Sequence, residues 1–320
     1  RQVMEQRALG SSGLRVSAVG LGCNNFGMRI GAPAARAVVG AALDAGITLF
    51  DTADVYGGQG ASETMLGKAL GARRADVVLA TKFGMPMDSG RGLAGASRRY
   101  IVRAAEDSLR RLGTDWLDLY YLHRPDPCTP MEETLRALDD LVRAGKVRYL
   151  GCSNLPAWQI ADAQWLSRTG RTERFICAQD EYSLIERSAE TALMPALRAY
   201  GMGLVPYFPL ASGLLTGKYR RGEEPPADSR FAAWTSFASR YATDANWALV
   251  ERLESFAAEH GHGLLDLAFA GLLAQDCVSS VIAGATSAAQ VRANVGAAAW
   301  RLDDAQADAL RELFQAPAPG

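Results

Sequence analysis

Short, nearly continuous apolar runs alternate with amphipathic segments along most of the chain. Uninterrupted apolar runs are typical of parallel strands that are covered on both faces. The pattern therefore predicts eight such strands. They lie at residues 17–23, 48–54, 77–83, 118–124, 147–154, 175–182, 203–209 and 278–285.

The segments between these runs have the periodicity of amphipathic helices. Apolar residues recur at three- and four-residue spacing, which gives a helix one face to bury. The clearest stripes are Ala35-Val38-Val39-Ala42, Ile101-Ala105-Ser108-Leu112 and Met131-Leu135-Leu138-Val142. Before the third stripe, Thr129 and Glu132 have the spacing of a capping box, with Pro130 at the first helical position.

Eight strand-helix units in 320 residues match the count of a closed barrel. An open, doubly wound sheet is the alternative, but the glycines at residues 20–27 do not have the spacing of its dinucleotide-binding turn. We therefore predict an α/β fold, a (β/α)8 TIM barrel, with residues 1–320 as a single domain.

Two additions to the simple repeat are expected. Residues 7–17, with Gly10-Ser-Ser-Gly13 at their centre, predict an N-terminal β-hairpin that plugs one end of the barrel. Residues 211–243 predict a long loop after strand seven, over the opposite end. The only low-complexity stretch is an Ala/Pro/Gly tail at residues 316–320.

Charge and composition narrow the class of function. Thirty-four basic residues stand against thirty-five acidic ones, so no bulk field favours nucleic acid or an anionic membrane, and neither is an expected partner. No apolar run approaches the length of a membrane span and no signal-like segment is seen, so we expect a cytoplasmic protein. Five scattered cysteines and three histidines offer no zinc ligand set, and no metal is expected.

Polar residues stand at or near the ends of the predicted apolar strands, where a purely structural design would continue with Val, Leu or Ile. Any one of them has an ordinary structural explanation, such as a hydrogen-bonded core histidine or a lysine that reaches solvent. In a parallel barrel, however, the carboxyl ends of all strands meet at one mouth, so together they predict one polar cavity. These residues are Asp51, Lys82, His123, Ser153, Asn154, Gln179 and Tyr207.

The residue types at this mouth suggest proton transfer to a carbonyl oxygen. Tyr56 follows Asp51 in the loop after the second strand. An ammonium about 4 Å from its hydroxyl, at an effective dielectric of about 20, favours the phenolate by up to roughly 4 kcal/mol. We therefore expect Lys82 to lower the pKa of Tyr56, by about three units at most. Asp51 would hold Lys82, His123 would donate a second hydrogen bond, and a reduced nicotinamide is the natural hydride source.

The motifs around these residues resemble the aldo-keto reductase superfamily along nearly the whole chain. They are Phe50-Asp-Thr-Ala-Asp-Val-Tyr-Gly57, Ala80-Thr-Lys-Phe-Gly84, Leu122-His-Arg-Pro-Asp126, Gly151-Cys-Ser-Asn154, Gln179-Asp-Glu-Tyr-Ser-Leu184 and Tyr207-Phe-Pro-Leu-Ala-Ser-Gly-Leu-Leu-Thr-Gly-Lys-Tyr219. The last one is similar to the bacterial and potassium-channel β-subunit branch. The resemblance implies an NAD(P)H-dependent oxidoreductase with four catalytic residues, Asp51, Tyr56, Lys82 and His123.

The resemblance also implies a cofactor site. Ser153, Asn154 and Gln179 would bind the nicotinamide carboxamide, and Tyr207 would stack on the ring. The remaining expected contacts are Leu210, Ser212 and Gly213 at the pyrophosphate and Gly284, Thr286, Gln290 and Asn294 at the adenosine, where Gln290 also has the spacing of a capping box with Ser287. The segment after strand eight lacks the Lys and Arg with which many members hold a 2′-phosphate.

The choice between NADP(H) and NAD(H) therefore depends on the loop after strand seven. In the β-subunit-like branch, an arginine of this loop serves part of the 2′-phosphate site; Arg230 matches it, with Lys218 nearby, and a guanidinium suits a phosphate. We expect NADP(H) to be preferred, with NAD(H) possible. The alternative is that Arg230 is an ordinary solvated loop charge.

The substrate is expected to be a small carbonyl or alcohol compound. Asn24 and Arg124 are the candidate substrate residues, beside Asn25, Phe26 and an aromatic side chain from Trp234 or Phe237. Loop solvation and helix capping are alternative roles for the polar residues. The alternative function is a nucleotide-binding regulatory or partner subunit with incidental turnover. A barrel isomerase or aldolase would require a phosphate or metal site, which the sequence does not indicate, and the sequence does not predict an oligomeric state.

Overall fold

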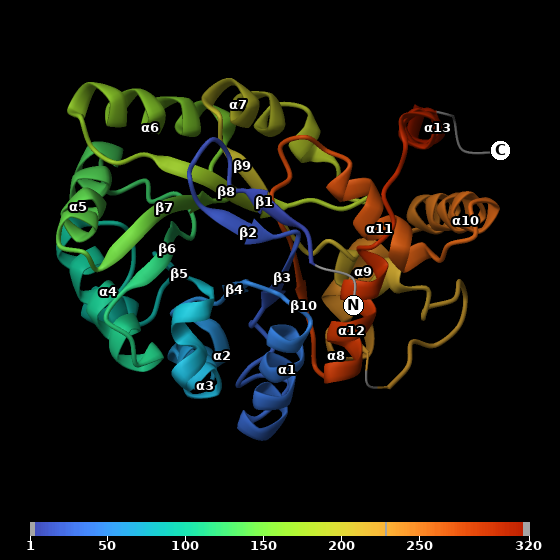
Figure 1. Cartoon of the computed structure of the whole chain (residues 1–320), viewed down its shortest axis with the longest axis horizontal. Helices are drawn as coiled ribbons and strands as arrows, with labels where there is room; N and C mark the ends of the chain where they lie inside the picture. Colours follow the sequence, from blue (N-terminus) through green and yellow to red (C-terminus); the bar gives the residue numbers. More distant parts are fainter. Residues whose placement is uncertain (1–3, 228, 316–320) are drawn as a thin grey trace.

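The computed structural model describes residues 4–227 and 229–315, so the tail expected at residues 316–320 lies outside them. Eight parallel strands form a barrel in the order β10-β3-β4-β5-β6-β7-β8-β9 (Figure 1). They are β3 (Val19–Gly22), β4 (Leu49–Asp51), β5 (Val78–Phe83), β6 (Leu117–Leu122), β7 (Val147–Ser153), β8 (Phe175–Glu181), β9 (Gly203–Tyr207) and β10 (Val281–Gly284). The predicted (β/α)8 TIM barrel is confirmed.

The barrel closes between β9 and the segment that leads into β10. Leu204 donates its N–H to the Cys277 carbonyl oxygen at 2.6 Å, and Ser279 donates to the Leu204 carbonyl at 2.9 Å. Residues 278–280, predicted as strand, therefore lie in this closing segment before β10. β4 is also shorter than predicted, because residues 52–54 already belong to the turn that leads to Tyr56, although they are buried like strand residues.

Helices surround the barrel and cover the outer faces of its strands (Figure 1). They are α1 (Ala32–Asp44), α2 (Tyr56–Gln59), α3 (Ala61–Leu70), α4 (Arg98–Leu112), α5 (Met131–Arg143), α6 (Ala157–Gly170), α7 (Leu193–Tyr200), α10 (Asp244–Glu259), α11 (Leu264–Leu273), α12 (Ala288–Ala297) and α13 (Asp304–Gln315). The predicted stripes of α1 and α4 are fully buried, and that of α5 is buried at Leu135 and Leu138.

The predicted capping box at the start of α5 is wrong. Pro130 itself is the N-cap residue of α5, with no side-chain cap. The Thr129 hydroxyl instead donates to the Asp126 carboxylate at 2.7 Å, and this carboxylate also accepts the N–H groups of Ala96 and Cys128. Thr129 is therefore used to order the loop after β6, next to the barrel mouth.

The predicted hairpin is present and plugs the barrel at the amino ends of its strands. β1 (Gln6–Ala8) and β2 (Arg15–Ser17) pair antiparallel and lie across the barrel (Figure 1). Leu9 and Val16 are fully buried in the cluster that fills the barrel interior. At Gly10, with φ of +59°, a Cβ atom would lie 2.7 Å from three backbone atoms of the barrel, so only glycine allows the tip to seat this closely.

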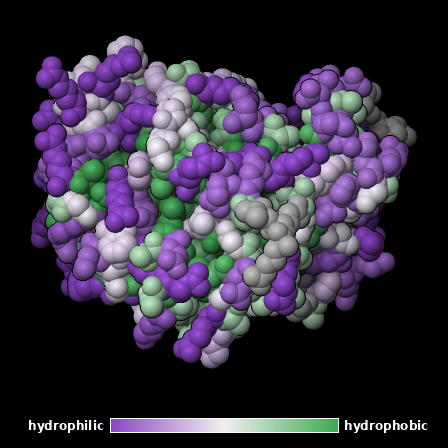
Figure 2. All heavy atoms as spheres, viewed as in Figure 1, coloured by the Kyte–Doolittle hydropathy of each residue, from purple (hydrophilic) through white to green (hydrophobic). Residues whose placement is uncertain are grey.

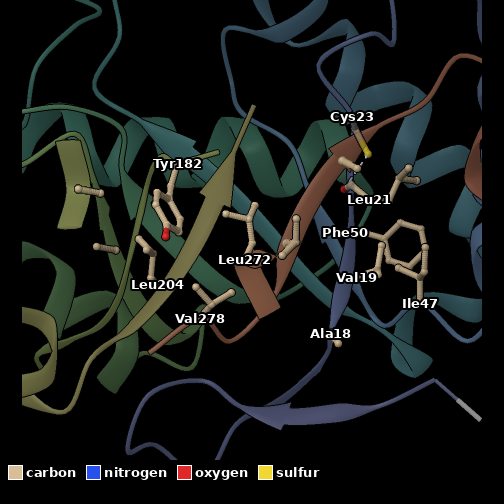
Figure 3. Close-up of a cluster of buried hydrophobic side chains, with 14 of the residues drawn as sticks. Ala18, Val19, Leu21, Cys23, Ile47, Phe50, Tyr182, Leu204, Leu272 and Val278 are labelled. Atoms are coloured by element: carbon tan, nitrogen blue, oxygen red, sulfur yellow. Dashed lines mark hydrogen bonds between the residues drawn. The ribbon is translucent and has the colours of Figure 1, made fainter. Parts of the chain in front are cut away.

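A second, larger apolar layer lies between the strands and the helices. Figure 3 draws part of it, including Val19 and Leu21 of β3, Phe50 of β4 and Leu272 of α11. On the face shown in Figure 2, hydrophilic side chains predominate and hydrophobic ones appear in patches between them. None of the helices in the described residues is both long enough and apolar enough to span a membrane.

The predicted loop after strand seven has more structure than expected. It contains η4 (Ala211–Thr216), α8 (Arg230–Ala233) and α9 (Thr235–Tyr241). Aromatic packing holds these short elements together: Tyr219 stacks on Phe231 with ring centroids 4.3 Å apart, and Phe237 packs edge-on to Phe208 and Trp234. The segment is thus a folded flap at the mouth rather than a structureless loop.

Candidate active site

A cavity of about 850 Å³ opens at the carboxyl ends of the barrel strands. It brings together the side chains that the sequence predicted from strand ends and loops far apart in the chain. Among the predicted residues its lining includes Asn24, Asp51, Tyr56, His123, Arg124, Ser153, Asn154, Gln179, Tyr207, Leu210, Ser212, Gly213, Lys218, Arg230, Gly284, Thr286, Gln290 and Asn294. Lys82 is fully buried directly behind this wall.

Lys82 and Asp51 form a buried ion pair from neighbouring strands. The Lys82 ammonium contacts the Asp51 Oδ1 atom and donates to the Thr52 carbonyl oxygen at 2.8 Å. Gln179 donates to the other Asp51 oxygen at 2.9 Å. Burial is the largest single effect and disfavours the ammonium, but Asp51 and Tyr56 together outweigh it and raise the pKa of Lys82, so the lysine stays charged. The expected pairing of these two residues is present.

Tyr56 stands between this pair and the cavity. Its hydroxyl oxygen lies 3.5 Å from the Lys82 Nζ atom, and the ammonium is 4.9 Å from the ring centroid. Contrary to expectation, the pKa of Tyr56 is raised above its usual value, because burial of the phenolate outweighs the opposing effect of Lys82. The sequence argument counted the lysine charge alone, but Asp51 neutralises much of it and also disfavours a phenolate.

His123 completes the polar wall beside Tyr56. The two rings pack edge to face, with centroids 5.8 Å apart. Burial, with the positive charges of Lys82 and Arg124, lowers the pKa of His123 to about 3. The imidazole is therefore neutral near pH 7, and one of its nitrogens carries a proton. Its Nδ1 atom is buried and has no hydrogen-bond partner within the described residues.

The ends of β6 to β9 are joined by hydrogen bonds around Asn154. Tyr207 donates its hydroxyl to the Asn154 Oδ1 atom at 2.8 Å, and Asn154 Nδ2 donates to the His123 carbonyl oxygen at 3.0 Å. The Ser153 hydroxyl donates to the Gln179 carbonyl oxygen at 2.6 Å. These four predicted residues, Ser153, Asn154, Gln179 and Tyr207, therefore share one corner of the cavity, next to His123.

The opposite side of the cavity has the features of an anion site. Ala211, Ser212 and Gly213 all have positive φ, and the N–H groups of Ala211 and Gly213 donate to the carbonyl oxygens of Phe208 and Leu210 within this turn. The Ser212 Oγ atom is buried without a partner in the described residues, and a Cβ atom on Gly213 would lie 3.4 Å from the Lys218 Nζ atom. An unpaired hydroxyl beside an ammonium suits a phosphate group.

The start of α12 borders the same side. Ser287 caps the helix by accepting the Gln290 N–H, while the Gln290 side chain accepts the N–H of Thr286 at 2.8 Å. The predicted capping box is therefore only half formed, because the side chain of Gln290 bonds one residue earlier than the cap. A helix N-terminus at a cavity favours negatively charged ligand groups.

Arg230 is half-buried at the edge of the cavity, without an acidic partner in the described residues. It donates a hydrogen bond to the Asn25 side-chain oxygen at 3.3 Å, and its guanidinium lies 5.5 Å from the Phe208 ring centroid. Burial lowers the pKa of Arg230, and the neighbouring positive charge of Arg29 adds to the effect. A half-buried guanidinium that faces a cavity without an acidic partner in the described residues suits a negatively charged ligand group.

The predicted wall of the cavity needs two corrections. Phe26 is fully buried in the core, because the loop after β3 folds back on the Asn25 carbonyl oxygen. Trp234 and Phe237 do not line the cavity, and Phe208 lines it in their place. Phe237 packs edge-on to Phe208, and Trp234 packs edge-on to Phe237. Asn25 does line the cavity, as predicted.

Sequence reasoning missed several lining residues. Met85 lies two residues after the predicted strand 77–83, and Phe208 lies next to Tyr207 within the predicted strand 203–209. The rule that identified His123 and Tyr207 would have found both if it had also been applied to their neighbours. Arg29 and Leu265 lie in a loop and a helix with no distinguishing pattern. No group of three or more His, Cys, Asp or Glu residues in the described part of the chain could hold a metal ion.

Comparison with known proteins agrees with this geometry. The model of the aldo/keto reductase family matches residues 18–315. The chain belongs to the aldo/keto reductase family. A probable voltage-gated potassium channel subunit beta of Oryza sativa is 40% identical over 301 residues, which cover 92% of this chain and 91% of the relative.

Bacterial relatives of this aldo/keto reductase are oxidoreductases. An uncharacterized oxidoreductase of Bacillus subtilis is 36% identical over 99% of this chain and 97% of its own length. An L-glyceraldehyde 3-phosphate reductase of Escherichia coli is 36% identical over 92% of this chain and 87% of its own. The chain therefore groups with the branch that includes potassium-channel β subunits and bacterial oxidoreductases, and the family supports nicotinamide-dependent carbonyl reduction in general.

Proposed function

We propose that this protein is an NADPH-dependent reductase that converts a small aldehyde or ketone to its alcohol, or catalyses the reverse reaction. The observation that carries this proposal is the position of Tyr56, with its hydroxyl between the cavity and the buried Lys82–Asp51 pair. The residues around the cavity fit a bound dinucleotide, which supplies the hydride. Proton donation and stabilisation of the developing charge are assigned to side chains of this protein.

Tyr56 donates the proton. Because its pKa is raised, the hydroxyl keeps its proton near neutral pH until negative charge develops on the substrate oxygen. Lys82 then stabilises the forming phenolate, and Asp51 keeps the ammonium charged and fixed. The neutral imidazole of His123 donates a second hydrogen bond to the same oxygen. Preorganised donors of this kind make up a large share of the rate enhancement of enzymes.

The cofactor would lie along the cavity from Asn154 to α12. Ser153, Asn154 and Gln179 offer amide and hydroxyl groups for the carboxamide. These groups bond to the Gln179 carbonyl oxygen, Tyr207 and Asp51, respectively, and must exchange these partners to bind a carboxamide. Tyr207 offers its ring for stacking. The anion site at Leu210, Ser212, Gly213 and Lys218 would hold the pyrophosphate, and Gly284, Thr286, Gln290 and Asn294 the adenosine.

Arg230 supports a preference for NADP(H) over NAD(H). We expect Arg230→Met to weaken NADPH binding by roughly 10- to 100-fold, since a hydrogen bond to a charged group contributes about 1.5–3 kcal/mol. NADH binding should hardly change, because NADH has no 2′-phosphate. Dissociation constants from cofactor fluorescence would measure both.

The matched control is Arg240→Met. Arg240 lies on α9 of the same flap, but it pairs with Glu181 and does not line the cavity. Its replacement should leave both dissociation constants close to normal. Equal weakening of NADPH and NADH by Arg230→Met would refute the assignment of Arg230 to the 2′-phosphate.

The substrate end of the cavity is polar and positively charged. Asn24 and Arg124 line it, and no acceptor for the exposed Arg124 side chain is found within the described residues. A guanidinium beside His123 would favour a carbonyl compound that carries a phosphate or carboxylate. The relative named for L-glyceraldehyde 3-phosphate reduction agrees with such a substrate.

A second candidate is a nucleotide-binding partner subunit in which turnover is incidental. The relatives from Oryza sativa and Arabidopsis thaliana, which are named as potassium channel β subunits, favour it. The presence of all four residues, Asp51, Tyr56, Lys82 and His123, is compatible with both functions. A partner subunit needs only to bind the nucleotide, whether or not these residues also catalyse turnover.

Single-turnover measurements separate them. Enzyme loaded with NADPH is mixed rapidly with a panel of small aldehydes and ketones that includes glyceraldehyde and its 3-phosphate, and the loss of NADPH absorbance is followed. The reductase proposal expects fast oxidation with at least one compound, and faster with the phosphate than with glyceraldehyde. Tight NADPH binding without oxidation by any of them would favour the partner subunit.

A further inference from the structure

Asn154 has an unusual backbone conformation for its position. Its φ is +60°, in the left-handed region that residues other than glycine seldom occupy. In this conformation its side chain reaches both the His123 carbonyl oxygen and the Tyr207 hydroxyl. A relaxed backbone would redirect the side chain, so something must hold Asn154 in place.

Within the described residues, the Asn154 N–H donates to the carboxyl group of Asp180. The Asp180 Oδ1 atom accepts this N–H at 3.1 Å. The second carboxyl oxygen, Oδ2, is buried and has no hydrogen-bond partner within the described residues. Asp180 directly follows Gln179 on β8, so its side chain leaves the strand on the opposite face from Gln179 and does not line the cavity. Among the described residues, its hydrogen bond to the site goes to Asn154, and its charge also acts on Tyr207.

We propose that Asp180 is a positioning residue that holds Asn154 in its left-handed conformation, and that loss of its proton strengthens this hold and favours the oxidised cofactor over the reduced one. The inference rests on the proposed function, because it assumes that a nicotinamide lies beside Asn154 and Tyr207. It concerns a residue outside the catalytic set and outside the lining of the cavity.

The surroundings of Asp180 allow it to change charge in the working pH range. Burial raises the pKa of Asp180 to about 8, and the Asn154 N–H opposes the effect. The titratable groups that respond to its charge are Cys152 on β7 and Tyr207 on β9, whose pKa values are raised mainly by burial and further by Asp180. No ion pair joins Asp180 to a cation of the described residues. The carboxyl group is therefore protonated at pH 7 and ionised above about pH 8.

Ionisation has two effects in the same direction. A carboxylate accepts the Asn154 N–H more strongly than a neutral carboxyl group, since charge-assisted hydrogen bonds are about twice as strong. The new negative charge also lies near Tyr207, and it attracts the positively charged oxidised nicotinamide but not the uncharged reduced ring. By linkage, binding of NADP⁺ should release a proton from Asp180 near pH 8.

Cofactor binding across the pH range tests the proposal. Dissociation constants of NADP⁺ and NADPH would be measured from pH 6.5 to 9.5 for the wild type and for Asp180→Asn, which keeps the Oδ1 acceptor. In the wild type, the affinity for NADP⁺ relative to NADPH should rise by about fivefold with a midpoint near pH 8. In Asp180→Asn the ratio should not change with pH. If Asp180 had only a structural role, Asp180→Asn would lower the affinity for both forms of the cofactor, and the pH dependence of their ratio would remain.

Asp54→Asn is the matched control, because burial also raises the pKa of Asp54 to about 8. Its carboxyl group faces the Tyr100 hydroxyl and the charge of Glu63, on the far side of the barrel mouth from Asp180. The transition should persist in Asp54→Asn. If it disappears there and persists in Asp180→Asn, the proposal is overturned.

A measurement on the cofactor-free protein separates the inference from the proposed function. The amide resonance of Asn154 should titrate near pH 8 in the wild type and stay constant in Asp180→Asn, because the N–H bonds to this carboxyl group. A constant resonance in the wild type would overturn the inference whether or not nicotinamide binds. A titrating resonance in a protein that binds neither NADP⁺ nor NADPH would refute the proposed function, and with it the claimed effect on the cofactor.

Discussion

Replacing Tyr56 with phenylalanine is expected to lower kcat for carbonyl reduction by roughly 1,000-fold, while the dissociation constant of NADPH stays close to normal. The substitution removes only the hydroxyl that lies 3.5 Å from Lys82 and keeps the ring that packs against His123. General acid catalysis by one positioned group contributes about 100- to 10,000-fold, so loss of this proton donor should dominate the kinetics. Steady-state rates and fluorescence titration of NADPH would provide the two readouts.

The control for this variant is Tyr149→Phe. Tyr149 is a tyrosine of β7 that packs against the cluster inside the barrel and does not line the cavity. It should keep near wild-type kcat. If Tyr56→Phe reduced aldehydes at a rate close to that of the wild type, Tyr56 would not be the proton donor and another group would have to fill the role.

The direction of the pKa shift adds a pH dependence to the same prediction. A proton donor must be protonated, and the pKa of Tyr56 lies above its usual value near 10. The rate of reduction should therefore stay level from neutral pH to about pH 9 and fall only at higher pH, as the free enzyme loses the phenolic proton. A rate that fell already between pH 6 and 8 would point to a different donor.

Replacing Lys82 with methionine is expected to damage both stability and activity. The substitution leaves Asp51, which is 3% exposed, as a buried carboxylate without its cation. Breaking a buried ion pair by removing one partner costs about 3–5 kcal/mol of the free energy of unfolding. Activity should fall as well, because the phenolate of Tyr56 would form without a neighbouring positive charge. Chemical denaturation and steady-state kinetics would measure the two losses.

The double variant Asp51→Asn with Lys82→Met separates the two effects. It removes the unpaired carboxylate, so much of the lost stability should return, while activity should stay low because the ammonium is still missing. The stability defect of Lys82→Met should also be smaller at pH 5 than at pH 8, since an unpaired buried carboxyl group takes up a proton as pH falls. A Lys82→Met protein as stable as the wild type at pH 8 would mean that Asp51 carries no charge there.

The catalytic wall could be predicted from the sequence because it depends on strand ends. Asp51, Lys82 and His123 interrupt or follow apolar runs, and in a parallel barrel all such positions meet at one mouth. The hairpin plug was predictable for a similar local reason, since glycines and serines mark its turn. These features follow from the order of strands and helices along the chain, and the hydrophobic pattern predicts that order.

Other features depend on how deeply individual side chains are buried, and the hydrophobic pattern of the sequence does not predict this. The pKa of Tyr56 rises because burial outweighs one lysine, and the sequence argument had no measure of that burial. Phe208 lines the cavity while Phe237 packs against it from behind, an arrangement set by side-chain packing in the flap. The contact of Asp180 with Asn154 depends on the register of β7 and β8, in which Ser153 lies opposite Gln179.

The hairpin under the barrel also has a kinetic consequence. Leu9 and Val16 fill the amino end of the barrel with apolar side chains, so cofactor and substrate must share the mouth at the other end. The nucleotide would occupy the wall of this mouth from Asn154 to α12, and a carbonyl compound that reaches Tyr56 would enter over it. We therefore expect ordered binding through this one opening: the nucleotide binds before the carbonyl compound, and the alcohol dissociates before the nucleotide.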